Sequence, residues 1–320
     1  MDDEGFAAPW VQFEEELGFR PLLHGPIEQC FKDWDQLGEA LVKNFRFPAP
    51  DPTVTTEDRS ITEGLKIRVY VPANHAGNTP LGLFIHGGGW AMGDLETDDG
   101  NCRAIARASD VVLVSVDYRL SPAHPSPAAL DDCVTAFKWT LQNATSLGGT
   151  IGQAFICGVS AGANLAFGTA LRLIDEGLGS AIAGIVAQLP VSIHPDLVPD
   201  ELKSKYTSYD EHAEHTVNSK SAMLAFWDAY GSPKDHYANC LLHPRLNELP
   251  KVYISCTAHD TLRDDARLMK EALGKNGVKV RYEEYPGYPH YFWTFPSPAL
   301  NEPAKTYIAN LNKGVAFVLS

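Results

Sequence analysis

Residues 154–162 read AFICGVSAG and carry the strongest structural signal in the chain. Its first four residues are apolar, as in a buried strand, and residues 163–173 continue with helical spacing. Between them lies G-x-S-x-G, formed by Gly158, Ser160 and Gly162. On a tight strand-to-helix turn such a serine projects its hydroxyl, and the glycines allow the close backbone approach that the turn imposes. A glycine-rich turn that merely contains a serine is the alternative, but the strand-helix context favours a nucleophile with a helix N-terminus behind it.

Strand and helix patterns alternate along most of the remaining chain. Nearly continuous apolar runs predict strands buried on both faces, whereas alternation of apolar and polar residues predicts a strand with one exposed face. The expected strands cover residues 65–71, 81–85, 111–116, 154–157, 182–189, 252–256 and 278–285. The expected helices cover residues 101–108, 128–141, 163–173, 264–275 and 302–319. This order predicts an α/β fold with a mostly parallel central sheet flanked by helices.

Two segments depart from this alternation. The first carries an apolar helix face with steps of three and four residues, formed by Phe31, Trp34, Leu37, Leu41 and Phe45. Three prolines in residues 47–52 then break any helix. The second segment inserts charge, Tyr and His between two core-like strands. We therefore expect N-terminal cap helices in residues 1–50, a core in 51–193 and 234–320, and an inserted helical cap in 194–233.

A second motif, HGGGW, follows the expected strand 81–85 and consists of His86, Gly87, Gly88, Gly89 and Trp90. Its glycines free backbone amides to point at a developing oxyanion. A phosphate-binding loop is the competing interpretation, but the chain has neither G-x-x-x-x-G-K-[ST] nor a helix-opening G-x-G-x-x-G with an acidic partner further on. A purely structural glycine-rich turn stays open at this point.

A serine nucleophile needs a base, and the base needs an orienting carboxylate. Asp260 follows the expected strand 252–256, and His290 follows a strand that we expect to end near Tyr285. Open α/β sheets place their sites at the carboxyl ends of the strands, so both side chains should reach the edge that carries Ser160. We therefore expect Ser160, Asp260 and His290 to be the catalytic residues.

Both partners of the serine have rivals nearby. Asp264 and Asp265 lie close to Asp260, but they open a helical pattern, where acidic residues are also favoured by the helix dipole. His259 borders Asp260, yet neighbouring side chains of an extended chain diverge. We expect His259 to serve structure or the rim of the site.

Composition argues against several classes of function. The chain has 320 residues, 44% of them hydrophobic, which is enough for a large core. Lys plus Arg is 26 and Asp plus Glu is 40, and the formal net charge of −14 argues against a nucleic-acid or anionic-membrane partner. No apolar stretch is long enough to cross a bilayer, and the N-terminus lacks the pattern of a signal peptide. We expect a cytoplasmic protein without membrane insertion.

The sequence gives no reason to expect a metal or another cofactor. Residues 211–215 read EHAEH, which differs from the zinc-binding H-E-x-x-H and is typical of a solvated surface. The cysteines form no C-x-x-C pair and have no His at zinc-ligand spacing. We interpret them as buried thiols in a reducing compartment. They are Cys30, Cys102, Cys133, Cys157, Cys240 and Cys256.

From about residue 65 to 292, these motifs resemble the hormone-sensitive-lipase-like group of α/β-hydrolase esterases. The resemblance rests on HGGGW, on DYRL at 117–120 before a Pro-rich stretch, on GVSAG followed by NLA at 164–166, and on the order of serine, aspartate and histidine. It implies an α/β-hydrolase fold, a cap over the acyl site, and oxyanion donors at the amides of Gly88, Gly89 and Ala161. More weakly, the length and the aromatic N-terminus resemble fungal esterases of secondary metabolism.

The chain departs from this family at three positions. Val159 stands where an acidic residue often precedes the serine, and Ala123 and Ser126 stand where Glu and Phe are frequent. We expect these changes to alter loop support and pocket shape, although they affect no triad or oxyanion position.

The resulting functional prediction is a carboxylic ester hydrolase that acts on a small-molecule ester. Trp90 beside the oxyanion loop and an aromatic cap predict short-chain acyl esters of a hydrophobic alcohol. Acyl transfer, and hydrolysis of an activated amide or lactone, use the same machinery and stay open. A non-catalytic receptor is disfavoured, because gibberellin receptors resemble this fold but lack the triad histidine, which is present here as His290. Monomer and homodimer both stay open.

Overall fold

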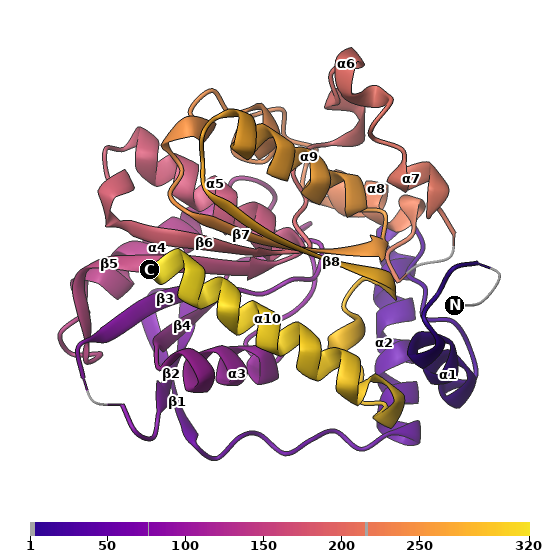
Figure 1. Ribbon diagram of the computed structural model, residues 1–320, viewed down its shortest axis with the longest axis horizontal. Coiled ribbons are helices and arrows are strands. Elements are labelled where there is room, and N and C mark those ends of the chain that lie inside the picture. The colour runs from indigo at the N-terminus through magenta and orange to yellow at the C-terminus, as the bar shows by residue number, and fades with distance from the viewer. Residues whose placement is uncertain (1–3, 76, 215–216) are drawn as a thin grey trace.

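An eight-stranded sheet forms the centre of the computed structural model, which describes residues 4–75, 77–214 and 217–320 (Figure 1). The strand order is β1-β2-β4-β3-β5-β6-β7-β8. The β1–β2 and β2–β4 pairs are antiparallel, and every later pair is parallel. The mostly parallel sheet predicted from the sequence is therefore confirmed. The strands are β1 (Val54–Thr62), β2 (Leu65–Pro72), β3 (Thr79–Ile85), β4 (Val112–Asp117), β5 (Gly149–Val159), β6 (Ile182–Gln188), β7 (Val252–His259) and β8 (Val280–Pro289).

The expected strands all lie within one or a few residues of observed ones, and two differences have physical reasons. β1 was not predicted, because its sequence VTTEDRSIT is mostly exposed at the edge of the sheet and carries little apolar signal. β8 runs on to Pro289 rather than ending near Tyr285, since His259 at the end of β7 still pairs with Pro289.

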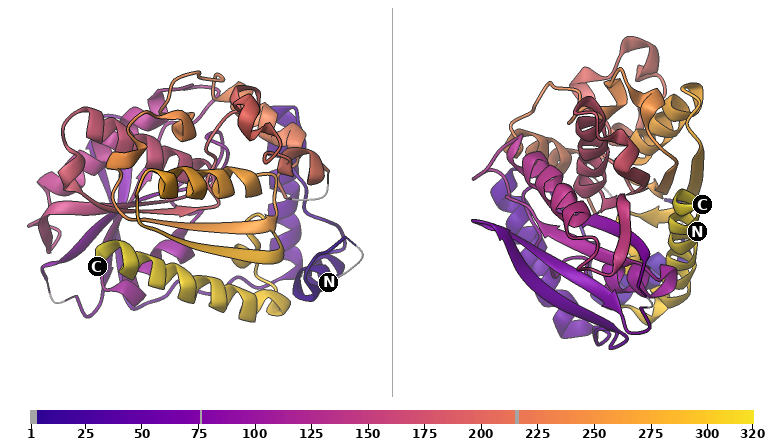
Figure 2. Two further views of the ribbon diagram at one scale, coloured as in Figure 1. Left: turned by 45° about the horizontal axis from the view of Figure 1, so that its top comes forward. Right: turned by 90° about the vertical axis from the view of Figure 1, so that its left-hand side faces the viewer.

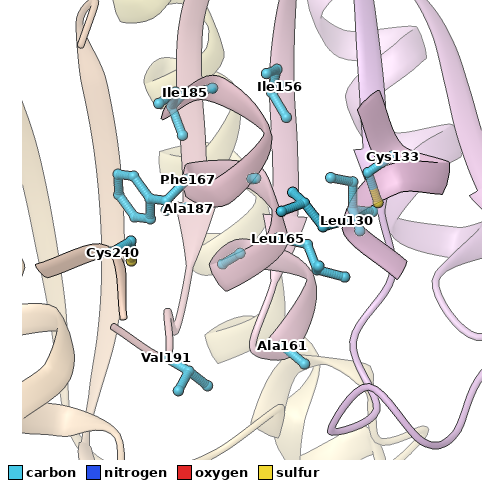
Figure 3. Packing of buried hydrophobic residues seen from close by; sticks show 14 of the residues in the cluster. Leu130, Cys133, Ile156, Ala161, Leu165, Phe167, Ile185, Ala187, Val191 and Cys240 are labelled. Atoms are coloured by element: carbon cyan, nitrogen blue, oxygen red, sulfur yellow. The ribbon is translucent and has the colours of Figure 1, made fainter. Parts of the chain in front are cut away.

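Helices cover both faces of the sheet, and α9 and α10 lie on opposite sides of it (Figure 2). On one face, Leu165 and Phe167 pack in the same cluster as Ile156 of the sheet (Figure 3). On the other face, Ile105 and Leu311 belong to a second cluster. The helices predicted in the core are confirmed as α3 (Asp99–Ser109), α4 (Ala128–Gln142), α5 (Ala161–Asp175), α9 (Arg263–Lys275) and α10 (Asn301–Leu319).

The N-terminal segment forms two helices, α1 (Ala8–Leu17) and α2 (Ile27–Asn44). The apolar pattern of residues 31–45 indicated α2, whereas no pattern had located α1. On α2, Leu37 and Leu41 are buried, whereas Trp34 is 41% exposed. The proline-rich stretch after α2 has no regular structure until β1, as expected.

The inserted segment between β6 and β7 contains short helices joined by turns and irregular stretches. It holds the short α6 (Asp200–Lys203) and α7 (Ser208–Glu211) and the longer α8 (Lys220–Ala229), which contacts α2. A parallel bridge between Leu23 and Asn218 also joins the N-terminal segment to this insertion.

Short 3-10 helices occur along the described chain. They are η1 (Gly179–Ala181), η2 (Pro195–Leu197), η3 (Cys240–Leu242), η4 (Leu246–Glu248), η5 (Phe292–Thr294) and η6 (Pro298–Leu300).

Each of the six cysteines is buried and has a free thiol. In the part of the chain that the structure describes, none of the helices combines the length and the apolar character that a membrane crossing requires.

Candidate active site

Ser160 occupies the turn between β5 and α5, near the middle of the sheet. Its backbone is strained, with φ 55° and ψ −120°. The turn is so tight that a Cβ on Gly158 would collide with the carbonyl oxygen of Gly162, and a Cβ on Gly162 would collide with that of Ile85. These collisions explain both glycines of the motif. The close approach of Gly162 to Ile85 also places the turn against the end of β3, where the HGGGW loop begins.

The first turn of α5 supplies an amide beside Ser160. The carbonyl oxygen of Ser160 accepts the N–H groups of Ala163 and Asn164 at 3.0 and 3.1 Å, which starts the helix. Ala161 is the first helical residue, so its N–H has no partner within α5. The helix dipole adds a partial positive charge at this end, and the position suits a developing oxyanion.

The HGGGW loop has a backbone that favours glycine. Gly88 and Gly89 have φ values of 110° and 60°, both in the left-handed region. A Cβ on Gly88 would collide with the carbonyl oxygen of Met92, and one on Gly89 would collide with the ring of Phe226. Both glycines line the same cavity as Ser160. The structure therefore brings together the two motifs that the sequence singled out.

Asp98, which sequence reasoning missed, accepts a hydrogen bond from the backbone of this loop. Its Oδ2 accepts the N–H of Gly87 and the hydroxyl of Tyr291, each at 3.3 Å. Asp98 is 4% exposed, and burial raises the pKa of its carboxyl to about 6. Tyr291 directly follows His290, so Asp98 joins the HGGGW loop to the loop that carries His290. It belongs to no motif, and only the fold places it there.

The two outer residues of HGGGW are structural. The Nδ1–H of His86 donates to the carbonyl oxygen of Gly87 at 2.7 Å, and its ring stacks on Tyr118 with centroids 4.2 Å apart. Burial lowers the pKa of His86 to about 4, so the ring is neutral. Trp90 is fully buried and stacks on Tyr230 at 4.6 Å. The expectation that Trp90 narrows the acyl site is therefore wrong, because its side chain packs into the core.

His290 and Asp260 follow the neighbouring strands β8 and β7 and meet through Nδ1 and Oδ2, 2.6 Å apart. Both are buried, with 5% and 1% exposure. Oδ2 of Asp260 also accepts the hydroxyl of Thr257 at 2.9 Å. Its Oδ1 accepts the N–H of Leu262 at 2.9 Å and the side-chain amide of Asn218 at 3.2 Å. Sequence reasoning did not identify Thr257 or Asn218.

These donors keep the buried Asp260 ionised. Burial alone would raise the pKa of Asp260, but the charge of His290 and the hydrogen bonds around the carboxylate hold that pKa below its ordinary value. An ionised carboxylate accepts the Nδ1–H of His290 and leaves Nε2 of the ring as a proton acceptor. Ser160 and His290 line the same cavity. The three predicted catalytic residues therefore lie at one edge of the sheet.

Asp264 and Asp265, the rivals of Asp260, are engaged elsewhere. Asp264 accepts the N–H groups of Thr207 and Ser208, both at 2.8 Å. Asp265 accepts the N–H of Ser192 at 2.7 Å, and burial raises its pKa to about 7. Both lie in the first turn of α9, as the helical pattern predicted. They tie the inserted segment and the loop after β6 to this helix.

His259 packs against the N-terminal segment, with its ring centroid 4.6 Å from that of Phe6 and its Nε2 3.1 Å from the carbonyl oxygen of Glu4. Of the EHAEH stretch, His215 lies outside the described residues. Within residues 4–75, 77–214 and 217–320, no group of three or more His, Cys, Asp or Glu side chains is arranged to hold a metal ion.

The cavity above Ser160 is small and mostly apolar. It has a volume of about 70 Å³. Its floor carries Ser160, His290 and the glycines of the loop, and its walls come from the N-terminal segment, the insertion and the loop after β8. The apolar wall residues include Leu23, Trp34, Val217, Met223, Phe226 and Phe295.

Comparisons with known proteins agree with this geometry. A family model described as the alpha/beta hydrolase fold matches residues 82–294. Versiconal hemiacetal acetate esterase from Aspergillus parasiticus is 47% identical over 315 residues, which cover 98% of each chain. Carboxylesterase NlhH from Mycobacterium tuberculosis is 30% identical over 283 residues, which cover 84% of this chain and 86% of the relative. The crystal structure of vibralactone cyclase superposes with a TM-score of 0.85 at 27% identity and covers 100% of this chain and 97% of that one.

Proposed function

We propose a substrate class for a chain that belongs to the α/β-hydrolase family, in its hormone-sensitive-lipase-like group, and is a serine carboxylesterase. The proposed substrates are short-chain acyl esters of a hydrophobic alcohol. The observation that carries this proposal is the convergence of Ser160, His290 and the glycines of the HGGGW loop on one apolar cavity. A reactive carbonyl bound there would contact the nucleophile, the base and the amide donors together.

In the proposed first half-reaction, Nε2 of His290 takes the proton of the Ser160 hydroxyl while the oxygen attacks the ester carbonyl. The N–H groups of Gly88, Gly89 and Ala161 stabilise the oxyanion. His290 then returns the proton to the leaving alcohol as the C–O bond breaks. Asp260 orients His290 and stabilises its charged form. An acyl group remains on Ser160.

In the second half-reaction, His290 removes a proton from water, which attacks the acyl carbonyl. The same amides stabilise the second oxyanion. His290 then returns the proton to Ser160 as the acyl–serine bond breaks, and the carboxylic acid leaves. The balance of the two steps is one ester and one water converted to one acid and one alcohol.

The proposed short acyl chain is supported by the walls of the cavity. The ring of Phe226, from α8, approaches Gly89 so closely that a Cβ there would collide with it. This ring therefore stands beside the expected oxyanion position and restricts the volume next to it. Trp34 on α2 is partly exposed at the cavity and offers apolar area to the alcohol. The relative named for a hemiacetal acetate agrees with an acetyl-sized group.

A panel of esters of one alcohol tests the substrate proposal. We expect kcat/KM to be highest for the acetyl or butyryl ester and to fall for the octanoyl and palmitoyl esters. A maximum at octanoyl or beyond would contradict a short-chain acyl site. The esterase assignment itself does not depend on that outcome.

Acyl transfer is the second candidate, and two observations favour it. The cavity is lined largely by apolar side chains, which lower the concentration of water near an acylated serine, and a structural neighbour is named a cyclase. A competing alcohol distinguishes the two reactions. Under the hydrolase proposal, butanol at moderate concentration leaves the carboxylic acid as the main product, whereas a transferase would form the butyl ester in excess over the acid.

A further inference from the structure

We propose that Asn218 is a positioning residue that holds the Asp260 carboxylate in place for His290, so that the inserted segment completes the catalytic site. This inference rests on the proposed triad. Asn218 is 4% exposed and lies just before α8. Its Nδ2 donates to Oδ1 of Asp260 at 3.2 Å. No sequence motif includes it.

The hydrogen bonds around Asp260 separate into two sets. The hydroxyl of Thr257 and the N–H of Leu262 come from β7 and the turn that follows it, so they belong to the same local stretch as the carboxylate. Asn218 comes from a different part of the chain, 42 residues away. It approaches the oxygen that does not face His290. The insertion therefore contacts the triad directly, in addition to covering the cavity.

The backbone of Asn218 is fixed from both sides. The N–H of Leu23 donates to the carbonyl oxygen of Val217 at 2.7 Å, and the N–H of Ser219 donates to that of Leu23 at 3.3 Å. The hydroxyl of Thr261, next to Asp260, donates to the carbonyl oxygen of Asn218 at 3.0 Å. The N-terminal segment and the turn after β7 thus hold this residue. An amide fixed in this way resists rotation of the carboxylate that it binds.

A buried carboxylate depends on such donors, because it has lost its contacts with water. Without Asn218, Oδ1 would keep the N–H of Leu262 but lose its other donor, which comes from the inserted segment. The carboxylate could then turn away from Nδ1 of His290, and the ring would spend less time with Nε2 toward Ser160. A hydrogen bond to a charged group is worth enough to change kcat by about tenfold to a hundredfold.

Two substitutions at this position separate donation from packing. Asn218→Ala should lower kcat by about tenfold to a hundredfold while KM changes less than threefold, since the ester carbonyl is not its partner. Asn218→Asp has the same shape but presents an acceptor to Oδ1, so its kcat should fall at least as far as that of Asn218→Ala. If Asn218 only filled space, Asn218→Asp would keep most of the activity. That result would overturn the proposal.

The matched control removes an amide from the N-terminal segment. Asn44 donates its side-chain N–H to the carbonyl oxygen of Leu17 at 3.2 Å, at the end of α2. Asn44→Ala should keep kcat and KM. Circular dichroism and thermal unfolding of each variant establish that the protein used for kinetics is folded.

A double-mutant cycle with Asp260→Ala distinguishes a failure of this inference from a failure of the proposed triad. Asp260→Ala alone should lower kcat by a factor on the order of 10⁴. In that background Asn218→Ala should cost less than twofold, because its partner is gone. If Asp260→Ala keeps its kcat, the proposed triad fails and this inference fails with it. If Asp260→Ala loses activity but Asn218→Ala does not, or costs equally in both backgrounds, only the role of Asn218 is overturned.

Discussion

Nδ1 of His290 lies 2.6 Å from Oδ2 of Asp260, and both side chains are almost fully buried. The hydrogen bonds to Asp260, together with the charge of His290, hold the pKa of that carboxyl below its ordinary value against the effect of burial. The carboxylate therefore stays charged at neutral pH and accepts the proton on Nδ1. That leaves Nε2 as the nitrogen that faces proton transfer, which is the requirement for a base beside Ser160.

Alanine substitution at three aspartates tests the choice of Asp260. Asp260→Ala should lower kcat by a factor on the order of 10⁴, because the ring of His290 loses its orienting partner. Asp264→Ala and Asp265→Ala should instead lower stability by about 1–3 kcal/mol, since each leaves buried donors unpaired, and should keep kcat within a few fold. Steady-state kinetics and thermal unfolding measure the two effects. Normal activity of Asp260→Ala with loss in Asp264→Ala would reverse the assignment.

Gly88→Ala tests whether the HGGGW loop acts through its backbone. The φ of Gly88 is 110°, and a Cβ there would collide with the carbonyl oxygen of Met92, so the loop must shift. We expect kcat to fall by a factor on the order of 10² with a smaller change in KM. Gly100→Ala is the control, because a Cβ there would meet nothing within 4 Å. A variant at Gly88 that binds poorly but turns over normally at saturation would indicate substrate positioning instead.

Asp98 predicts a pH dependence of stability. Burial raises its pKa to about 6, so the folded state binds the proton more tightly than the unfolded state does. Protonated Asp98 stabilises the folded state fully below the unfolded pKa of about 4, and this stabilisation is lost as pH rises through about 6. The change in the free energy of unfolding amounts to about 3 kcal/mol. Asp98→Asn keeps an acceptor for Gly87 and Tyr291 but does not titrate.

The comparison for Asp98 is thermal unfolding of the two proteins between pH 4 and 8. The Tm of Asp98→Asn relative to the native protein should rise from pH 4 to about 7 and then level off. Parallel curves over this range would show that Asp98 does not titrate with a raised pKa.

Phe226→Ala should move the acyl preference toward longer chains. Removal of the ring that stands against Gly89 opens space beside the proposed oxyanion position. We expect the ratio of kcat/KM for octanoyl over acetyl esters to rise by about tenfold or more, in line with a few buried methylenes gaining contact. Phe19→Ala, at a side chain that is 45% exposed, should leave the ratio unchanged. An unaltered ratio in Phe226→Ala would place the acyl chain elsewhere.

The core of this protein could be predicted because its signals are local. Continuous apolar runs identified the buried strands, and the glycines around Ser160 identified the turn. Asp260 and His290 could be placed because each directly follows a strand, and parallel strands bring their carboxyl ends to one edge. β1 was not predicted because this edge strand is mostly polar and exposed.

The rest of the site depends on contacts between distant parts of the chain. Asp98 and Tyr291 are 193 residues apart, and Asn218 reaches Asp260 from the insertion. No spacing or period in the sequence connects such pairs. The expectation for Trp90 failed for a related reason. Trp90 follows Gly89 directly in the chain, but its backbone has a φ of 59° and its buried ring stacks on Tyr230 in the core.

The most direct measurement follows the acyl group itself. The protein is mixed with an activated acetyl ester, quenched in acid during the first turnovers, digested and mapped by mass spectrometry. We predict one acetyl group on the hydroxyl of Ser160, and its absence from Ser160→Ala, which should remain folded and lose roughly 10³-fold or more in kcat. An acetyl group on another residue that turns over at the catalytic rate, or a folded Ser160→Ala that keeps most of its esterase activity, would contradict the account.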